Sequence, residues 1–234
     1  MLKLSDRLQK IADFIEPGES VADIGTDHGF LPVALWESGK SPLVILSDIN
    51  AGPLEKAKEN IDKHFPGKEF DLRIGSGIRT LKPAEVDVIV IAGMGGLLIA
   101  DILGDDLEKS KTYPKLILQP RNAQDKLRGW LLKNGFTIRD EALVRERKYL
   151  CEIIVAMPYP SVERFSDLDL EISPILFEKK DPLLIEFIEN KIRIEMKVYD
   201  EIQAGAKKDK AEKLAKSAKR LESLLDLKKR RELK

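Results

Sequence analysis

The feature that most constrains the fold is a short apolar run containing an acid, followed at once by a glycine-containing turn. The run covers Val21 to Ile24 and includes Asp23, and Gly25 and Gly29 follow at a spacing of four. An amphipathic segment begins directly afterwards. This order is typical of the first strand, tight turn and first helix of a nucleotide-type α/β domain, whose ligands bind outside the carboxyl ends of the strands. The turn is therefore the first place to look for a site.

The charge of this turn restricts what it binds. A G-x-G-x-x-G dinucleotide fingerprint needs a bare second glycine so that the backbone approaches a pyrophosphate, but here that position is Asp27, four residues after Asp23. Two like charges about 4 Å apart repel by roughly 4 kcal/mol at an effective dielectric near 20, which disfavours adding a pyrophosphate. The same pair favours a ligand with an ammonium and a sulfonium. S-adenosylmethionine is the common cofactor that fits, so the turn predicts a methyl-donor site.

Composition excludes several classes of protein. With 43% hydrophobic and 34% charged residues, the chain is typical of a soluble globular protein with a core. No apolar run approaches the roughly 20 residues that span a bilayer, and the first residues turn charged at once, so neither a membrane segment nor a secretory signal is expected. The single cysteine, Cys151, suits a reducing compartment, and a cytoplasmic location is expected.

Charge is distributed unevenly although the net charge is zero. Residues 206–234 contain twelve Lys/Arg and five Asp/Glu, a net charge of +7, which leaves the rest of the chain at −7. A basic arm on an acidic body favours a polyanionic partner that contacts mainly the arm. The alternative is a solvated helix face with no partner.

Seven β-type runs predict an α/β sheet. The second run ends in Asp48, about 25 residues past Asp23, where a carboxylate accepts hydrogen bonds from ribose hydroxyls; a helix N-cap is the alternative role. The last two runs are joined by a turn too short for parallel neighbours, so they form an antiparallel hairpin. We expect a Rossmann-like, seven-stranded sheet with a reversed last strand, unlike dehydrogenase-type sheets. The expected strands are 21–24, 43–48, 70–74, 86–91, 116–118, 137–146 and 149–157.

The composition changes after residue 160, where helical patterns replace strand patterns. Two long helices, 183–204 and 207–233, are separated by Gly205, a helix stop. Apolar residues of the second recur at spacings of 3 and 4, which is an a/d seam. The pair is expected to pack antiparallel within one monomeric chain, with pairing between two chains as the alternative. We expect a catalytic, cofactor-binding domain over 1–160 and a helical, coiled-coil, RNA-binding domain over 161–234.

With these motifs placed, the chain resembles the bacterial tRNA (adenine-N1)-methyltransferases that modify adenine 22, class I S-adenosylmethionine-dependent enzymes with a C-terminal coiled coil. Asp-x-Gly-x-Asp-His-Gly and Gly-Met-Gly-Gly together are specific for this resemblance. Its motifs reach from near residue 1 to about 157, and the helical tail matches only in character. The matching stretches are 22–32, 47–50, 91–99, 116–120 and 141–152.

The resemblance and the turn motifs together predict a cofactor site. In the third turn Ser76 stands where the resemblance leads us to expect an acid, so a contact of this side chain with the adenine amine is not expected, and the backbone of 76–78 is the alternative contact to the base. Asp23 has an alternative role as a cap of turn amides. The predicted cofactor-binding residues are Asp23, Gly25, Thr26, Asp27, His28, Gly29, Asp48, Ile49, Asn50, Gly75, Ser76, Gly77, Ala92, Gly93, Met94 and Gly95.

Methyl transfer is an in-line displacement, and it constrains which groups act on the acceptor. Adenine N1 attacks with an in-plane lone pair and needs no prior deprotonation, and a nearby carboxylate stabilises the charge that develops. Asp27 is the first catalytic candidate and His28 the second. For His28 the alternative is a turn residue that binds only backbone.

The substrate side follows from the turn after the fourth strand. An Asn/Asp-Pro-Pro-aromatic loop grips an exocyclic amine in many amino-group methyltransferases, whereas this chain has glycines at 93, 95 and 96, which favour a ring nitrogen of a flipped base. Close packing of helix and strand is the alternative reason for them. The chain offers no metal-ligand spacing. The predicted substrate-binding residues are Gly96, Gln119, Pro120, Arg121, Asn122, Lys207, Lys208, Lys213 and Lys216.

Three rival functions stay open on sequence alone. One is a class I methyltransferase acting on another RNA base or on a non-RNA substrate. Another is a nicotinamide oxidoreductase, which Asp27 and the reversed hairpin disfavour. The third is a non-catalytic RNA-binding adaptor with a vestigial cofactor fold, although nothing structural requires two acids in the turn.

Overall fold

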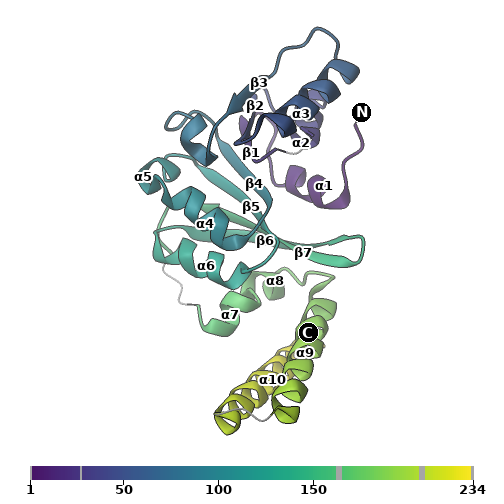
Figure 1. The fold of residues 1–234 in the computed structure, drawn as a ribbon, viewed down its shortest axis with the longest axis vertical. Helices are drawn as coiled ribbons and strands as arrows, with labels where there is room; N and C mark the ends of the chain where they lie inside the picture. The colour runs from purple at the N-terminus through teal and green to yellow at the C-terminus, as the bar shows by residue number, and fades with distance from the viewer. Residues whose placement is uncertain (1, 27, 162–164, 206–208, 233–234) are drawn as a thin grey trace. The chain divides into compact units, whose positions relative to one another are not determined.

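The computed structural model describes residues 2–26, 28–161, 165–205 and 209–232 (Figure 1). Three residues of the predicted site, Asp27, Lys207 and Lys208, lie outside the described residues.

Seven strands in the described part of the chain form one sheet, in the order β3-β2-β1-β4-β5-β7-β6. The first five pair in parallel, and β7 is antiparallel to both of its neighbours. The predicted seven-stranded sheet with a reversed last strand is therefore confirmed. The strands are β1 (Val21–Ile24), β2 (Val44–Asp48), β3 (Asp71–Ile74), β4 (Val88–Met94), β5 (Lys115–Pro120), β6 (Thr137–Glu146) and β7 (Tyr149–Met157).

Helices cover both faces of the sheet. Ser5 caps the first helix by accepting a hydrogen bond from the Leu8 amide, and Ile11 and Ile15 are buried in the core beside the sheet. The helices of the first part of the chain are α1 (Asp6–Asp13), α2 (Phe30–Glu37), α3 (Ala51–His64), the 3-10 helix η1 (Gly77–Thr80), α4 (Gly96–Gly104), α5 (Leu107–Ser110), α6 (Gln124–Lys133) and α7 (Asp167–Glu171).

The core is divided by the sheet into two layers. Val88 and Val90 of β4 belong to one cluster with apolar residues of α1, α2 and α3. Ile89 and Ile91 alternate with them, are fully buried and lie outside that cluster, so they face the opposite layer, where α4 and α6 pack together (Figure 1). Parallel strands buried on both faces read as continuous apolar runs, which is why the sequence located them.

A buried arginine ties the reversed strands to the helices. The Arg128 guanidinium of α6 is fully buried, and its nitrogens lie 2.8 Å from Glu141 of β6 and 2.6 Å from Glu152 of β7. It also donates a 3.0 Å hydrogen bond to the Leu170 carbonyl of α7. Through this contact α7 packs with the first compact unit of the chain, Met1–Ser173. The second unit is Pro174–Lys234, so the boundary between the two units lies later in the chain than residue 160.

The second unit contains α8 (Pro174–Glu178), α9 (Leu184–Ala204) and α10 (Lys210–Glu232). Glu195 of α9 accepts a hydrogen bond from the Ser217 hydroxyl and pairs with Arg220, while Glu189, earlier in α9, pairs with Lys228, later in α10. The two helices therefore run antiparallel within one chain. No helix in the described ranges is long and apolar enough to span a membrane.

Candidate functional site

The Gly turn after β1 is fastened to the neighbouring strand. The amides of Gly25 and Thr26 both donate to the Ser47 carbonyl of β2, over 2.7 and 3.1 Å. Gly25 has φ +76°, and a Cβ on it would come within 1.9 Å of the Met94 methyl carbon. The left-handed backbone favours glycine here, and the Met94 methyl, the end of a flexible side chain, occupies the space that a Cβ would take.

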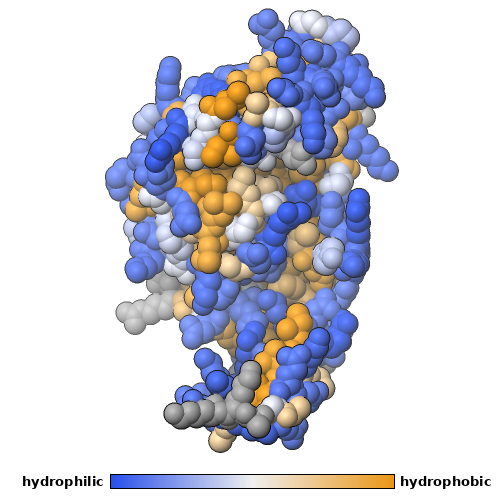
Figure 2. Space-filling view, viewed as in Figure 1, coloured by the Kyte–Doolittle hydropathy of each residue, from blue (hydrophilic) through white to orange (hydrophobic). Residues whose placement is uncertain are grey.

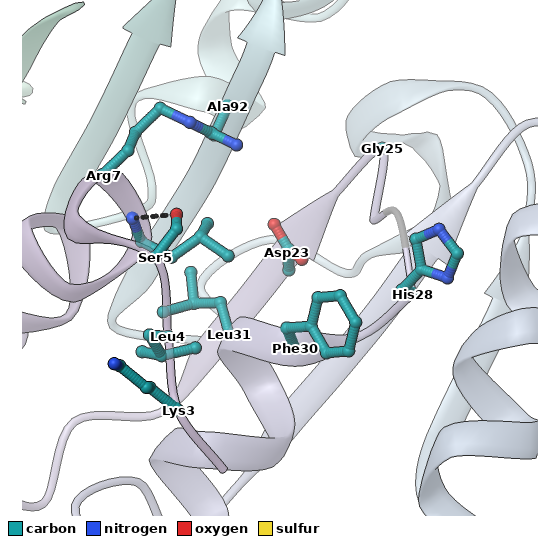
Figure 3. A pocket seen from close by; sticks show the side chains of 11 residues that line it. Lys3, Leu4, Ser5, Arg7, Asp23, Gly25, His28, Phe30, Leu31 and Ala92 are labelled. Carbon is teal, nitrogen blue, oxygen red and sulfur yellow. Dashed lines mark hydrogen bonds between the residues drawn. The ribbon is translucent and has the colours of Figure 1, made fainter. Parts of the chain in front are cut away.

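Asp23 is the acid that the structure places in a cavity. The cavity has a volume of about 390 Å³. The residues before α1, residues of α1 and of the Gly turn, and Ala92 of β4 contribute to its lining. In Figure 3 the Asp23 carboxylate points into this space, beside Phe30 and Leu31 and across from Arg7. Burial raises the pKa of Asp23 to about 6, against the lowering influence of Thr26 and of the Arg7 guanidinium.

Thr26 adds a second buried polar group beside Asp23. Its hydroxyl oxygen is buried and lies near enough to Asp23 to lower the pKa of that carboxylate, but it forms no hydrogen bond of good geometry with the described residues. Asp23 forms no ion pair in the same part of the chain. A buried carboxylate left unpaired is costly, and a cation in the cavity would relieve that cost.

His28 and Phe30 form one wall of this cavity. His28 has φ +63°, and its ring stacks on that of Phe30 with a centroid distance of 5.4 Å. The Asn60 amide nitrogen donates to the His28 carbonyl over 3.0 Å. The adjacent Gly29 sits so close to Leu46 and Ala57 that a Cβ would come within 3.0 Å of both, so its small size is needed for packing.

Asp48 ends β2 beside the Gly turn. One of its carboxylate oxygens accepts a 2.7 Å hydrogen bond from the Asn50 amide. Asn50 is the N-cap residue of α3, and its side chain makes no cap hydrogen bond within the described residues. Since the N-cap position of α3 is Asn50, the alternative N-cap role of Asp48 is reduced to this turn contact. Apolar side chains flank this edge, since Ile49 is 63% and Ile74 67% exposed.

The third predicted turn lies against the same edge. The Gly75 amide donates to the Asp48 carbonyl over 2.9 Å, which brings the end of β3 beside the end of β2. Ser76 precedes η1 in extended conformation, and Gly77 has φ +51°. The predicted cofactor residues of the first three strand ends that are described thus gather at one edge of the sheet.

The glycine-rich end of β4 has both structural and open positions. Gly96 needs to be glycine for packing, because a Cβ there would lie 2.5 Å from the Ala123 carbonyl oxygen. Gly93 is different: it has φ +78°, and a Cβ on it would meet nothing within 4 Å. The Arg121 amide donates a hydrogen bond to the Met94 carbonyl over 2.7 Å, which connects the end of β4 to the residue that follows β5.

Arg7 and Gln119 connect this edge to a second cavity. Gln119 is 2% exposed, and its side-chain oxygen accepts hydrogen bonds from Arg7, over 3.1 Å, and from the Gly93 amide, over 3.2 Å. Its amide nitrogen donates to the Pro120 carbonyl. The second cavity, of about 530 Å³, is lined by Arg7, Gly93, the end of β5, Arg121, Gln124 and the tip of the β6–β7 hairpin. The two cavities adjoin at Ala92 and Gly93 and share Arg7.

The other predicted site residues are distributed as follows. Asn122 lies in the loop after β5, where its carbonyl accepts from the Gly96 amide. Lys213 and Lys216 are exposed on α10, in the second unit. Figure 2 shows an apolar patch over α4, where Leu97 and Leu98 are 59% and 51% exposed. No group of three His, Cys, Asp or Glu side chains that could hold a metal occurs within the described ranges.

Several residues that line the cavities were not identified from the sequence. Arg7, Phe30 and Leu31 line the first cavity, and Tyr149 lines the second. In the sequence, Leu31 reads only as a core residue and Arg7 only as the polar face of a helix. No local pattern places Arg7 beside Gln119, which is 112 residues away.

The residues in and around the first cavity fit S-adenosylmethionine. Asp23 offers a carboxylate without an ion pair among the described residues for an ammonium, Thr26 offers a buried hydroxyl, and the open space at Gly93 leaves room for a ligand at the end of β4. Asp48 offers a carboxylate at the edge where ribose hydroxyls are bound in folds of this kind.

Comparison with known proteins agrees with this geometry. Residues 4–154 match the family described as a methyltransferase domain. The tRNA (adenine(22)-N(1))-methyltransferase of Bacillus subtilis is 32% identical over 231 residues, 97% of each chain. The crystal structure of the B. subtilis m1A22 tRNA methyltransferase is 31% identical, with a TM-score of 0.85, and the match covers 97% of this chain and 100% of that one. A Streptococcus pneumoniae protein crystallised with S-adenosyl-L-methionine is 30% identical, with a TM-score of 0.80, over 94% of this chain and 100% of that one.

Proposed function

The chain belongs to the tRNA (adenine(22)-N(1))-methyltransferase family, and on that premise we propose that it transfers a methyl group from S-adenosylmethionine to N1 of an adenine in tRNA. The name of the Bacillus relative assigns position 22, and we propose the same position here.

One observation carries the proposal: the buried Asp23 carboxylate, without an ion pair in the described part of the chain, faces a cavity at the carboxyl end of β1. We assign Asp23 to the ammonium group of the methyl donor and Asp48 to its ribose hydroxyls. S-adenosylmethionine supplies, when bound, an electrophilic methyl group on a sulfonium. The adjoining space at Gly93 leads towards the second cavity, where the acceptor base approaches.

The residues around the acceptor act by positioning and by electrostatics. N1 attacks with its own lone pair, so no side chain has to remove a proton first. Positive charge develops on the base, and we propose that Asp27 stabilises it, with His28 as the second candidate. Because N1 lies on the Watson–Crick edge, the adenine has to be unpaired or extruded before it reaches this pocket.

The helical unit provides the arm for RNA. Lys213 and Lys216 are exposed one turn apart on α10, and cations along a helix bind phosphates with little sequence preference. We propose that these lysines, with Lys207 and Lys208, contact the tRNA backbone. We also propose that the protein acts as a monomer in the cytoplasm, where its substrate is found.

The test is methyl transfer to defined RNA. The full chain is incubated with radiolabelled S-adenosylmethionine and unmodified tRNA, and the product is digested to map the altered nucleoside. Label in 1-methyladenosine at position 22 is expected, and it should be absent when adenine 22 is replaced. Label in another nucleoside, or in protein alone, would contradict the proposed methylation of adenine 22 in tRNA.

A further inference from the structure

The tip of the β6–β7 hairpin forms one wall of the second cavity. Glu146 pairs with Tyr149 across the hairpin, so only Arg147 and Lys148 form the turn. Arg147, Tyr149, Leu150 and Cys151 line the cavity of about 530 Å³, a volume in the range of small-molecule pockets. Arg121, which follows β5, also lines this cavity.

Tyr149 presents an aromatic ring at the protein surface. Tyr149 is 62% exposed, so much of its ring is open to solvent. The Lys148 ammonium lies 5.3 Å from the centre of the ring. An exposed ring beside a cation is the arrangement on which nucleobases stack in single-strand binding proteins, where the ring supplies stacking and the cation meets the backbone.

Arg147 occupies a backbone position that suits a different residue. It has φ +55° at the first position of a two-residue hairpin turn, where glycine is the usual choice. Its guanidinium and that of Arg121 form no ion pair or hydrogen bond within the residues that the structure describes, and both side chains are exposed. A strained position occupied by a free arginine points to a function for the side chain.

We propose that this hairpin tip is a nucleotide-binding element of the tRNA site, in which Tyr149 stacks on a base of the RNA while Arg147 and Arg121 bind its phosphates. The inference rests on the proposed function and deepens it, because it assigns the hairpin a role in gripping the RNA beside the acceptor. Arginine suits this role because its planar fork binds phosphate oxygens in pairs.

The first test uses variants of Tyr149 in the full chain. Tyr149→Ala is expected to weaken tRNA binding about tenfold or more, the loss of one stacked base, while Tyr149→Phe keeps the stacking surface and binds nearly as the parent does. The matched control is Tyr159→Ala, another exposed tyrosine, which lies beyond the opposite end of β7. It should bind tRNA normally. Calorimetry with S-adenosylmethionine should give the same affinity for all of them.

The second test separates the role of Arg147 from that of the turn. Arg147→Gly removes the guanidinium but suits the positive φ, so the variant should be at least as stable as the parent. Its tRNA affinity should nevertheless fall several-fold, and the slope of log affinity against log salt should become shallower by roughly one phosphate contact. A merely structural arginine would not give this combination.

The third test needs no variant. Cys151 is the only cysteine of the chain and lines the cavity, so alkylation by iodoacetamide reports whether the cavity is covered. Saturating tRNA should slow the alkylation markedly, and poly-glutamate of equal charge should not.

The outcomes are distinct. If the parent methylates tRNA but Tyr149→Ala and Arg147→Gly behave like Tyr159→Ala and tRNA leaves Cys151 unprotected, the hairpin inference fails while the proposed function stands. If the parent neither binds nor methylates tRNA, both fail.

Discussion

Arg7 of α1 donates a hydrogen bond over 3.1 Å to the side-chain oxygen of Gln119 at the end of β5, and this single contact joins the walls of the two cavities. The same Gln119 oxygen accepts from the Gly93 amide, so the guanidinium steadies the loop at which methyl donor and acceptor are proposed to meet. Arg7 also lies within 4.0 Å of Glu146 beside the hairpin tip.

Arg7→Ala is therefore expected to lower kcat/KM for tRNA methylation about tenfold, because the Gly93 loop loses its brace, at a stability cost of about 1 kcal/mol. Removing a cation that lowers the pKa of Asp23 should also weaken methyl-donor binding near pH 6. Steady-state kinetics and calorimetry measure both effects. Lys10→Ala on the same helix is the control and should leave them unchanged.

Asp23 is expected to oppose stability while serving binding. Since burial raises its pKa from 3.8 to about 6, the folded protein holds this proton more tightly than the unfolded chain does. Its contribution is therefore most favourable below pH 4 and is lost as the pH rises to 6, by about 3 kcal/mol. Asp23→Asn should raise the melting temperature of the free protein at pH 7 and yet weaken methyl-donor binding at least tenfold. A variant that loses both stability and affinity would contradict this assignment.

The pH dependence of methyl-donor binding follows from the same group. A cationic ligand prefers ionised Asp23, so its affinity in the parent should fall by up to tenfold per pH unit below pH 6. Calorimetric titrations at pH 5, 6 and 7 measure this. In Asp23→Asn the dependence should disappear, and its persistence would show that another group governs it.

Gly93 and Gly96 are expected to respond differently to alanine. Gly96→Ala places a Cβ 2.5 Å from a backbone oxygen that cannot move alone, so it should destabilise the protein by about 1–3 kcal/mol. Gly93→Ala meets no atom and costs only the positive φ, about 1 kcal/mol, but it intrudes on the proposed ligand space. Urea unfolding and methyl-donor titration should therefore rank the two variants in opposite orders.

The buried Arg128 cluster predicts a stability effect that is not additive. Arg128→Met leaves two buried carboxylates uncompensated and should cost about 3–5 kcal/mol. Adding Glu141→Gln and Glu152→Gln removes those charges, so the triple variant should recover part of the loss in urea unfolding. Arg139→Ala, an exposed arginine on β6, is the control and should change stability by less than about 0.5 kcal/mol.

The lysines of α10 predict an effect on RNA alone. Lys213→Glu with Lys216→Glu should weaken tRNA binding at least tenfold and make its salt dependence shallower by roughly two phosphate contacts. Methyl-donor affinity should not change. Lys213→Arg with Lys216→Arg keeps the charge and should bind tRNA normally, and equal binding by the glutamate variant would remove the arm from the interface.

The sequence by itself determined the local elements. The strands β6 and β7 have the predicted bounds, because a two-residue turn between long β runs allows only a hairpin. The Asp23 turn and Asp48 were located by their spacing, since parallel strands bring their carboxyl ends to one edge. Only the tertiary structure decided which distant groups meet there. Arg7 reaches Gln119, Arg128 pairs with Glu141 and Glu152, and α7 joins the first unit through Leu170, because these contacts depend on packing between elements far apart in the chain, which no local pattern encodes.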